Sequence, residues 1–517
     1  MSLRRCFLPL CILAFMAVTA SGQKFRLERL NVTVNEPVAI MAAPGDTTDR
    51  LFVVSRGPGR VYIIKDGVKL SQPFISVAND INSNGSGGLL GMAFHPNYNQ
   101  NGRFYLSWAT DTPEGDSVVA EFTVSATDPD VADPASRKDI FGPLPQTSQF
   151  HKAGDLAFGP GTLLYYSLGD GNPFGEPTDN RAQDPLDPRG SILRFDVDLP
   201  YPHIPPDNPF VGDPNGHDAI WAMGLRNPFR ITVDRPSGDL YIADVGDSTW
   251  EEINFIPGGA PAPVNFGWRC MEGPDCPFNQ PNFCEPCGHP GYSQAIYQYD
   301  HASGRGCSAI GGQVYRGDAL PGMVGRYVFA DFCAEHIWSF KTVGGIATDF
   351  RDHWVEMYPF KGTYNSPTCF GSDGAGELYA ADYYGDELFK LVPWAPFVDL
   401  GNGLGGINGI PALTGDGTLQ GSTPITLTVS NGPSFAQAVF VLGLQAIDVP
   451  FKGGLLVPEP FSVTPGLPLD GGGSLAIPGT WPPGIPPGFK VYFQYWIPDP
   501  AGPLGFSASN ALAGMTP

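Results

Sequence analysis

Short runs of aromatic and β-branched residues recur six times in the first three quarters of the chain. Each run follows another apolar run and a turn, and most are followed by a third apolar run. In the last repeat, Phe370 and a turn at 373–374 precede the run 378–381, and 388–391 follows it. Such runs between turns predict antiparallel strands. The six runs begin at Leu51, Phe104, Leu164, Leu240, Tyr327 and Leu378.

The repeat of strand, turn, strand, loop and strand is typical of a propeller blade. The intervals of 53, 60, 76, 87 and 51 residues exceed the roughly 40 to 50 of compact propeller repeats, so the excess must lie in loops. Radial stacking protects the sheet edges that isolated meanders would expose. A β-sandwich with irregular strands would not explain six copies of one motif. We therefore predict a six-bladed β-propeller over residues 23–396, with its strands at about 25 to 395.

The pattern changes after about Val398, where charged residues become rare. Alternating or wholly apolar runs at 425–429, 438–442 and 490–496 predict further strands. Residues 397–517 are therefore expected to form a small C-terminal β-sandwich. This region holds no cluster of His, Cys or paired carboxylates, so we expect an accessory role such as attachment or packing.

Composition supports an all-β fold and excludes some partners. The 66 glycines and 54 prolines among 517 residues disfavour long helices. The net charge of −22, from 30 basic and 52 acidic residues, would repel phosphate backbones. We expect neither nucleic acids nor anionic membranes as partners.

Residues 1–22 have the pattern of a secretory signal. Arg4 and Arg5 precede the apolar stretch 6–18, and small residues follow at 20–22. A membrane anchor is the alternative, but about 20 apolar residues are needed to cross a bilayer. We predict cleavage, a secreted or extracytoplasmic protein, and no membrane span in the mature chain.

Export would place the remaining seven cysteines in an oxidising compartment, where disulfides are the rule. Four of them, Cys270, Cys276, Cys284 and Cys287, crowd a loop-like stretch. The CxxC spacing at 284–287 also suits a zinc site, but we favour a disulfide-stapled loop. Because seven is odd, at least one thiol must stay unpaired within the monomer.

Chemistry is expected where loops converge on the propeller axis. His151 precedes the strand 156–158, and Asp170 follows the run 164–167. The two residues lie at adjacent ends of neighbouring antiparallel strands, so they can meet at one face. A histidine held by a carboxylate is the arrangement of a general base, although ordinary loop hydrogen bonding is the simpler alternative.

Two further loops carry candidate residues. Arg226 and Asn227 stand before a strand, where an arginine usually caps a loop but also suits a developing oxyanion. The segment 243–247, with Gly246 and Asp247, is followed by 251–252; it is either a polar turn or an oxygen-rich loop for a hard cation such as Ca²⁺.

Taken together and in order, these segments resemble the glucose/sorbosone dehydrogenase family. The matching segments are GGLLGMAFHPNY at 87–98, HKAGDLAFGP at 151–160, SLGDG at 167–171, GLRNPFRITVD at 224–234, ADVGDSTWEEINFI at 243–256, NFGWRCMEG at 265–273 and GGQVYRG at 311–317. The family includes soluble quinoprotein sugar dehydrogenases, which use pyrroloquinoline quinone (PQQ) and Ca²⁺. It also includes proteins resembling the Hedgehog-interacting proteins.

The resemblance implies roles residue by residue. His151 would be the base that takes the proton of the sugar hydroxyl, and Asp170 would orient it. Arg226 and Asn227 would contact the quinone, with Arg226 polarising the carbonyl that accepts hydride. Gly246 and Asp247 stand where backbone carbonyls bind Ca²⁺ in the enzymes.

The chain departs from the sugar dehydrogenases at three places on the cofactor side. Ser86 replaces a glutamine of the quinone site, Cys333 stands where those enzymes have a lysine, and the segment 364–366 replaces late arginines. Three quinone carboxylates need cationic partners. The resemblance therefore implies either an exported PQQ-dependent dehydrogenase acting on an aldose or related sugar, or a non-catalytic propeller that binds a glycan or a protein. NFGWRCMEG and the Cys-rich stretch are closer to the second branch.

Overall fold

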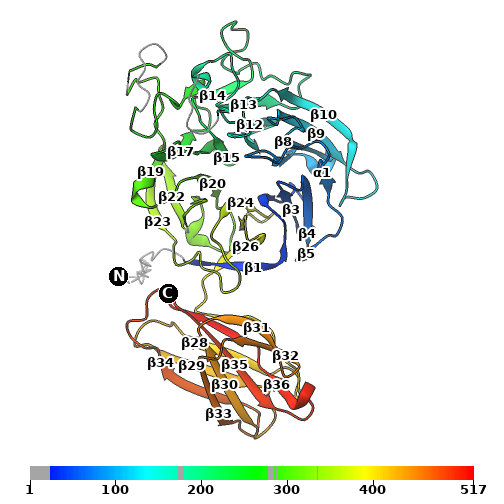
Figure 1. The fold of residues 1–517 in the computed structure, drawn as a ribbon, viewed down its shortest axis with the longest axis vertical. Helices are drawn as coiled ribbons and strands as arrows, with labels where there is room; N and C mark the ends of the chain where they lie inside the picture. The colour runs from blue at the N-terminus through cyan, green and yellow to red at the C-terminus, as the bar shows by residue number, and fades with distance from the viewer. Residues whose placement is uncertain (1–23, 173–179, 277–283, 287, 335) are drawn as a thin grey trace, which may run out of the picture.

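The computed structural model describes residues 24–172, 180–276, 284–286, 288–334 and 336–517. The predicted leader and Cys287 lie outside these ranges. Six mainly antiparallel sheets surround one axis, and the strands after residue 396 form a second body beside them (Figure 1). Among the described residues, no helix is long and apolar enough to cross a membrane. The predicted all-β fold, a six-bladed propeller followed by a small β-sandwich, is confirmed.

Five blades follow one another along the chain, each with its inner strand first. The first comprises β2 (Pro37–Met41), β3 (Arg50–Ser55), β4 (Arg60–Lys65), β5 (Val68–Lys69) and β6 (Ile75–Ser76), and the second β7 (Leu89–Phe94), β8 (Arg103–Ala109), β9 (Ser117–Val124) and β10 (Ala132–Leu144). The third comprises β11 (Ala153–Phe158), β12 (Leu163–Leu168), β13 (Ser191–Asp196), β14 (Ile220–Met223) and β18 (Val264–Asn265). The fourth comprises β15 (Pro228–Asp234), β16 (Asp239–Asp244), β17 (Trp250–Ile256) and β19 (Tyr297–Asp300), and the fifth β20 (Ala309–Val314), β21 (Arg326–Asp331), β22 (Ile337–Val343) and β23 (Ile346–Asp352).

The sixth blade closes the ring. It contains β24 (Pro367–Ser372), β25 (Leu378–Asp382) and β26 (Glu387–Pro393), and its outer strand is β1 (Phe25–Thr33). Phe25 lies opposite Pro393, so the start of the propeller pairs with its end. The apolar pattern does not predict this pairing, which covers a sheet edge that would otherwise be open.

The six recurring runs all lie in the second strand of a blade: β3, β8, β12, β16, β21 and β25. These strands are almost completely buried because neighbouring blades pack against both of their faces. Burial on both faces requires a continuous apolar run rather than an alternating one. This is the physical reason that the repeat is visible in the sequence.

The inner strands β2, β7, β11, β15, β20 and β24 contact one another in turn around the axis. The last residues of all six strands line one common cavity, which shows that the strands run in the same direction. The end of the ring where these strands begin is called the N-terminal face below, and the end where they finish is called the C-terminal face.

The remaining helical turns are short, and the C-terminal strands form the predicted sandwich. The helical segments are α1 (Tyr98–Asn101), η1 (Arg181–Gln183), η2 (His301–Ser303), η3 (Pro321–Met323) and η4 (Pro503–Gly505). One sheet holds β27 (Phe397–Asp399), β30 (Gln437–Gly443), β33 (Ser462–Pro468), β35 (Lys490–Pro498), β36 (Phe506–Ala508) and β37 (Leu512–Met515); the others hold β28 (Ala412–Gly417), β29 (Pro424–Ser430) and β34 (Leu475–Thr480), and β31 (Ala446–Phe451) and β32 (Gly454–Pro458). Tyr492 donates its hydroxyl proton to the carbonyl of Phe360 at 3.1 Å, which ties the sandwich to the propeller.

The cysteines follow the predicted staple. Cys270 is bonded to Cys284, and Cys276 is also disulfide-bonded, which excludes a zinc site at these thiols. A further bridge, Cys307–Cys333, was not predicted. Cys369 is free and buried, and it is therefore an unpaired thiol of the kind that the odd count requires.

Candidate functional site

A buried histidine–carboxylate pair lies at the N-terminal face of the third blade. His151 comes just before β11 and Asp170 just after β12, and these strands are antiparallel neighbours, with Ala153 opposite Leu168. His151 Nδ1 lies 2.7 Å from Asp170 Oδ1, and both side chains are buried. The structure therefore brings together the two residues that the sequence singled out.

Asp170 is held as an anion by several donors. Its Oδ2 accepts from Trp268 Nε1 at 2.9 Å, and its Oδ1 accepts from the backbone N–H of Asn172 at 3.0 Å. Burial alone would raise the pKa of Asp170, but the hydrogen bond and charge of His151, together with the Asn172 N–H and the charge of Arg226, lower it below its ordinary value. The carboxylate can therefore fix the imidazole and stabilise its protonated form. Sequence reasoning assigned no role to Trp268 or Asn172.

The backbone around the histidine is tightly constrained. His151 has a φ of +51° and Ala153 one of +50°, values in the left-handed region that cost energy for residues with a Cβ. A Cβ on Gly169 would lie 2.1 Å from the His151 carbonyl oxygen, so glycine is required at that position. Lys152 is fully buried and donates to the carbonyl of Ser148 at 2.6 Å, which holds the loop from the other side.

The loop before β15 adjoins this pair. Asp170 N donates to the Arg226 carbonyl at 2.8 Å, and Asn227 Oδ1 accepts from Ala153 N at 3.2 Å. The Arg226 guanidinium is paired with Asp247 at 3.0 Å and lies over the Trp268 ring, 5.6 Å from its centroid. His151, Asp170, Arg226 and Asn227 therefore form one connected group across two blades.

Buried acidic side chains contact the loop that carries Arg226 and Asn227. Asp244 accepts the backbone N–H groups of Arg226 and Asn227 at 2.9 and 2.7 Å. Burial, together with the charge of Glu252, raises the pKa of Asp244 well above its ordinary value despite these donors. Burial raises the pKa of Glu252 to about 6. These two buried carboxyl groups therefore bind a proton more readily than exposed ones do.

The predicted calcium loop has a defined shape. Glu272 Oε1 accepts the backbone N–H groups of residues 247, 248, 249 and 250 at 2.8 to 3.2 Å. A Cβ on Gly246 would lie 1.6 Å from the Trp250 carbonyl, so the loop requires glycine there. The Asp247 carboxylate is occupied by Arg226. Across the described ranges, no group of three or more His, Cys, Asp or Glu side chains is placed to hold a metal, so Ca²⁺ at Gly246 and Asp247 stays a prediction based on backbone carbonyls.

Ser86 lies at the same face. Its backbone N–H donates to the Gln149 carbonyl at 2.9 Å, which places the second-blade loop beside the segment that leads to His151. Arg56 donates to the carbonyls of Gly85 and Gly87 at 3.1 and 2.7 Å on that same loop.

Two arginines that border the site lie outside the sequence segments that match the family. Arg56 follows β3 and donates to the Ser86 loop, and Arg181 donates to the Asp170 carbonyl at 3.4 Å and to Thr147 Oγ1 at 2.8 Å. Both lie outside the matching segments, so only the fold reveals them. With Arg226, they place three arginine side chains around the histidine–carboxylate pair.

The three departures from the sugar dehydrogenases have clear structural positions. Ser86 is placed as described above, and Cys333 is bonded to Cys307 and cannot supply a cation. The N–H groups of Asn365 and Ser366 donate to Asp382 Oδ2 at 2.7 and 2.8 Å, so the segment that replaces the late arginines faces a carboxylate.

Fold and site together define a class: a six-bladed propeller with a histidine–carboxylate pair and an Arg-Asn loop at one end of its axis. The chain belongs to the Glucose / Sorbosone dehydrogenase family, whose model matches residues 34–356.

Two curated proteins are similar to this chain over part of their length. The HIPL1 protein of Arabidopsis thaliana is 33% identical over 367 residues, covering 57% of this chain and 51% of that protein. The Hedgehog-interacting protein of Mus musculus is 33% identical over 226 residues, covering 40% of this chain and 32% of that protein. The chain spans about a third to two thirds of the length of the curated relatives it matches.

Among solved structures, the PQQ-bound form of aldose sugar dehydrogenase from Streptomyces coelicolor is similar in fold. Its TM-score is 0.54 at 22% identity, and the match covers 72% of this chain and 98% of that one. At this identity the likeness establishes the propeller fold and nothing finer.

Proposed function

We propose that this protein is an exported dehydrogenase that oxidises a hydroxyl group of an aldose or related sugar, with PQQ as hydride acceptor. The observation that carries the proposal is the buried 2.7 Å contact between His151 Nδ1 and Asp170 Oδ1, next to Arg226 and Asn227. An ordinary loop histidine needs neither the buried anionic partner nor the indole donor that fixes that partner.

The pair is suited to accept a proton. Asp170 holds the proton of the neutral imidazole at Nδ1, which makes Nε2 the basic nitrogen. Nε2 then takes the hydroxyl proton of the sugar, and the Asp170 carboxylate stabilises the imidazolium that forms. Trp268 keeps the carboxylate in place during this transfer.

In this proposal, residues of the N-terminal face would hold the quinone at both of its polar ends. When bound, PQQ supplies a carbonyl carbon that accepts hydride from the sugar. Arg226 and Asn227 would hold that part of the group, with Ser86 at the opposite loop. Arg56 and Arg181 would meet its carboxylates, since a buried anion without a cationic partner costs several kcal/mol. Gly246 and Asp247 would hold the Ca²⁺ that supports it.

Export is part of the same proposal. The described residues hold two complete disulfides, Cys270–Cys284 and Cys307–Cys333, and such bonds persist in oxidising compartments. The leader pattern at 1–22 is consistent with this location.

The decisive experiment separates quinone binding from turnover. The purified protein is titrated with PQQ in the presence of Ca²⁺ while the quinone absorbance is followed, and dye reduction is then measured with a panel of aldoses. We expect binding and turnover, and His151→Ala should reduce turnover at least ~100-fold while leaving the quinone bound. The matched control His336→Ala, at the partly exposed pair with Asp352, should keep normal turnover. Absence of quinone binding would exclude the proposal.

A second candidate is a non-catalytic propeller that binds a glycan or a protein. The Cys307–Cys333 bridge favours it, because it replaces a cation of the sugar dehydrogenases at this face. The similarity to the Hedgehog-interacting protein points the same way. This function would be favoured over the first if the protein does not bind the quinone but does bind to a glycan array. Arg56→Gln should then weaken the glycan binding.

A further inference from the structure

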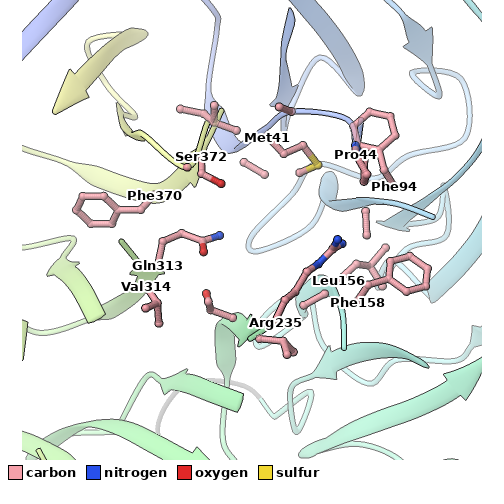
Figure 2. Close-up of a pocket in the computed structure, with 18 of the residues that line it drawn as sticks. Met41, Pro44, Phe94, Leu156, Phe158, Arg235, Gln313, Val314, Phe370 and Ser372 are labelled. Carbon is pink, nitrogen blue, oxygen red and sulfur yellow. The ribbon is translucent and has the colours of Figure 1, made fainter. Parts of the chain in front are cut away.

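A cavity of about 380 Å³ opens at the C-terminal face of the propeller, at the other end of the axis from His151. The last residues of all six inner strands line it (Figure 2). The rings of Phe94, Phe158 and Phe370 are turned into the cores between blades, so the exposed wall is more polar than apolar, with Met41 among its apolar side chains. Its volume is that of a site for a small organic molecule.

The inner end of this cavity is closed by a buried ion pair. Arg230 donates to the carbonyls of Leu90, at 3.0 Å, and Val38, and so reaches across the axis to β7 and β2. Asp155 lies 3.4 Å from the guanidinium and accepts the Ile231 N–H at 3.0 Å. The cavity is therefore separated from the histidine site by the residues that hold the inner strands together.

Three polar side chains project into the cavity: Arg235, Gln313 and Ser372 (Figure 2). Within the part of the chain that the structure describes, none of these side chains makes a hydrogen bond or an ion pair. Their donors come from β15 or its end, from β20 and from β24, three different blades. They converge on one space with their hydrogen-bonding capacity unused.

The charges that line the cavity leave one cation uncompensated. Asp155 is paired with Arg230, and Asp234 with Arg316 at 3.0 Å. Asp373 is paired with Lys390 at 3.2 Å. Arg235 alone keeps an unbalanced charge, on an exposed side chain at the rim of the cavity. An anion in the cavity would compensate that charge.

We propose that this cavity binds a small amphipathic carboxylate. The carboxylate group pairs with Arg235 and accepts from Gln313 and Ser372, and the apolar part of the ligand packs against Met41. A planar guanidinium fork matches a carboxylate in two parallel hydrogen bonds. A phosphate dianion would need a second cation, and every other cation at the cavity already has its own carboxylate.

Isothermal titration of the purified protein at constant ionic strength tests this site, with hexanoate as the probe and acetate, hexanamide and inorganic phosphate as comparisons. We expect saturable binding of hexanoate, tighter than that of each comparison. Acetate lacks the apolar chain, hexanamide lacks the charge, and phosphate lacks both the chain and the fitting geometry. Equal or tighter binding of any of the three, or no binding of hexanoate at millimolar concentration, would overturn the proposal.

Variants place the ligand in this cavity. Arg235→Gln should weaken hexanoate binding by about tenfold or more, since a charge-assisted hydrogen bond is lost. Arg60→Gln makes the same change of charge at the exposed first residue of β4 and should leave the affinity unchanged. Unchanged affinity in Arg235→Gln would refute the site. These measurements need neither quinone nor sugar, so their outcome is independent of the proposed dehydrogenase activity.

Discussion

The two faces of the propeller are built from the same six inner strands, yet they differ in chemistry. At the N-terminal face, His151, Asp170, Arg226 and Asn227 are joined by hydrogen bonds and ion pairs. At the C-terminal face, a cavity contains the uncompensated Arg235. The polar side chains of the first face bond to one another, whereas the side-chain donors of Arg235, Gln313 and Ser372 at the second face have no partner among the described residues.

The difference follows from the loops. The loops after β12 and β16 enter the N-terminal face, where they meet the segments that lead to His151 and Arg226. Turns from the first to the second strand of each blade form the C-terminal face, and several of them are short, as at 159–162 and 235–238. Long loops can bring polar side chains together, whereas short turns leave strand ends and a central space.

The largest expected effect concerns the N-terminal face. Asp170→Asn removes the anion that stabilises protonated His151, so dye-linked turnover should fall by about 10²–10⁴-fold. Hexanoate binding at the other face should not change. Asp133→Asn, on the exposed outer strand β10, is the control and should alter neither property. A drop in hexanoate binding with Asp170→Asn would mean that the two faces are coupled.

Arg230 lies between the faces, and its loss should affect both. Arg230→Met leaves Asp155 buried without its partner, which should lower the free energy of unfolding by about 3–5 kcal/mol in urea titrations. Adding Asp155→Asn removes the unpaired charge and should restore part of that loss. If the double variant is no more stable than the single one, the cost lies in the lost bonds to the carbonyls of Leu90 and Val38 instead.

The Cys307–Cys333 bridge belongs to the N-terminal face alone. Replacing both cysteines by serine opens a loop of 26 residues, and the free energy of unfolding should fall by about 3 kcal/mol. Quinone affinity should fall with it, while hexanoate affinity should be kept. Cys369→Ala, a buried free cysteine at the cavity, should show a smaller loss of stability and is the comparison.

The smallest effect is a pH dependence of stability. The pKa of Glu252 is about 6 in the folded protein against an ordinary 4.5, so folding favours its protonated form. That contribution is present below about pH 4.5 and is lost as the pH rises through about 6. Because the side chain keeps some contact with solvent, we expect the protein to be about 1–2 kcal/mol more stable at pH 5 than at pH 7 from this group. Thermal unfolding of Glu252→Gln across this range should show a flatter profile, and an unchanged slope would contradict the assignment.

The sequence by itself determined the blades and the centre of the candidate site. Strands buried on both faces need continuous apolar runs, so the run at 164–167 and its five counterparts are visible without a structure. His151 and Asp170 could be paired in advance because they end adjacent antiparallel strands, and such proximity is local. The stapled loop could be predicted from cysteine spacing in the same way.

Only the tertiary structure decided the contacts that depend on ring closure. β1 pairs with β26, Trp268 donates to Asp170 from 98 residues away, and Arg230 reaches the carbonyl of Val38 from 192 residues away. Arg56 and Arg181 adjoin the site, and Arg235 enters the cavity, for the same reason. These positions follow from the angle at which six blades stack around one axis, a property that no local pattern of residues encodes.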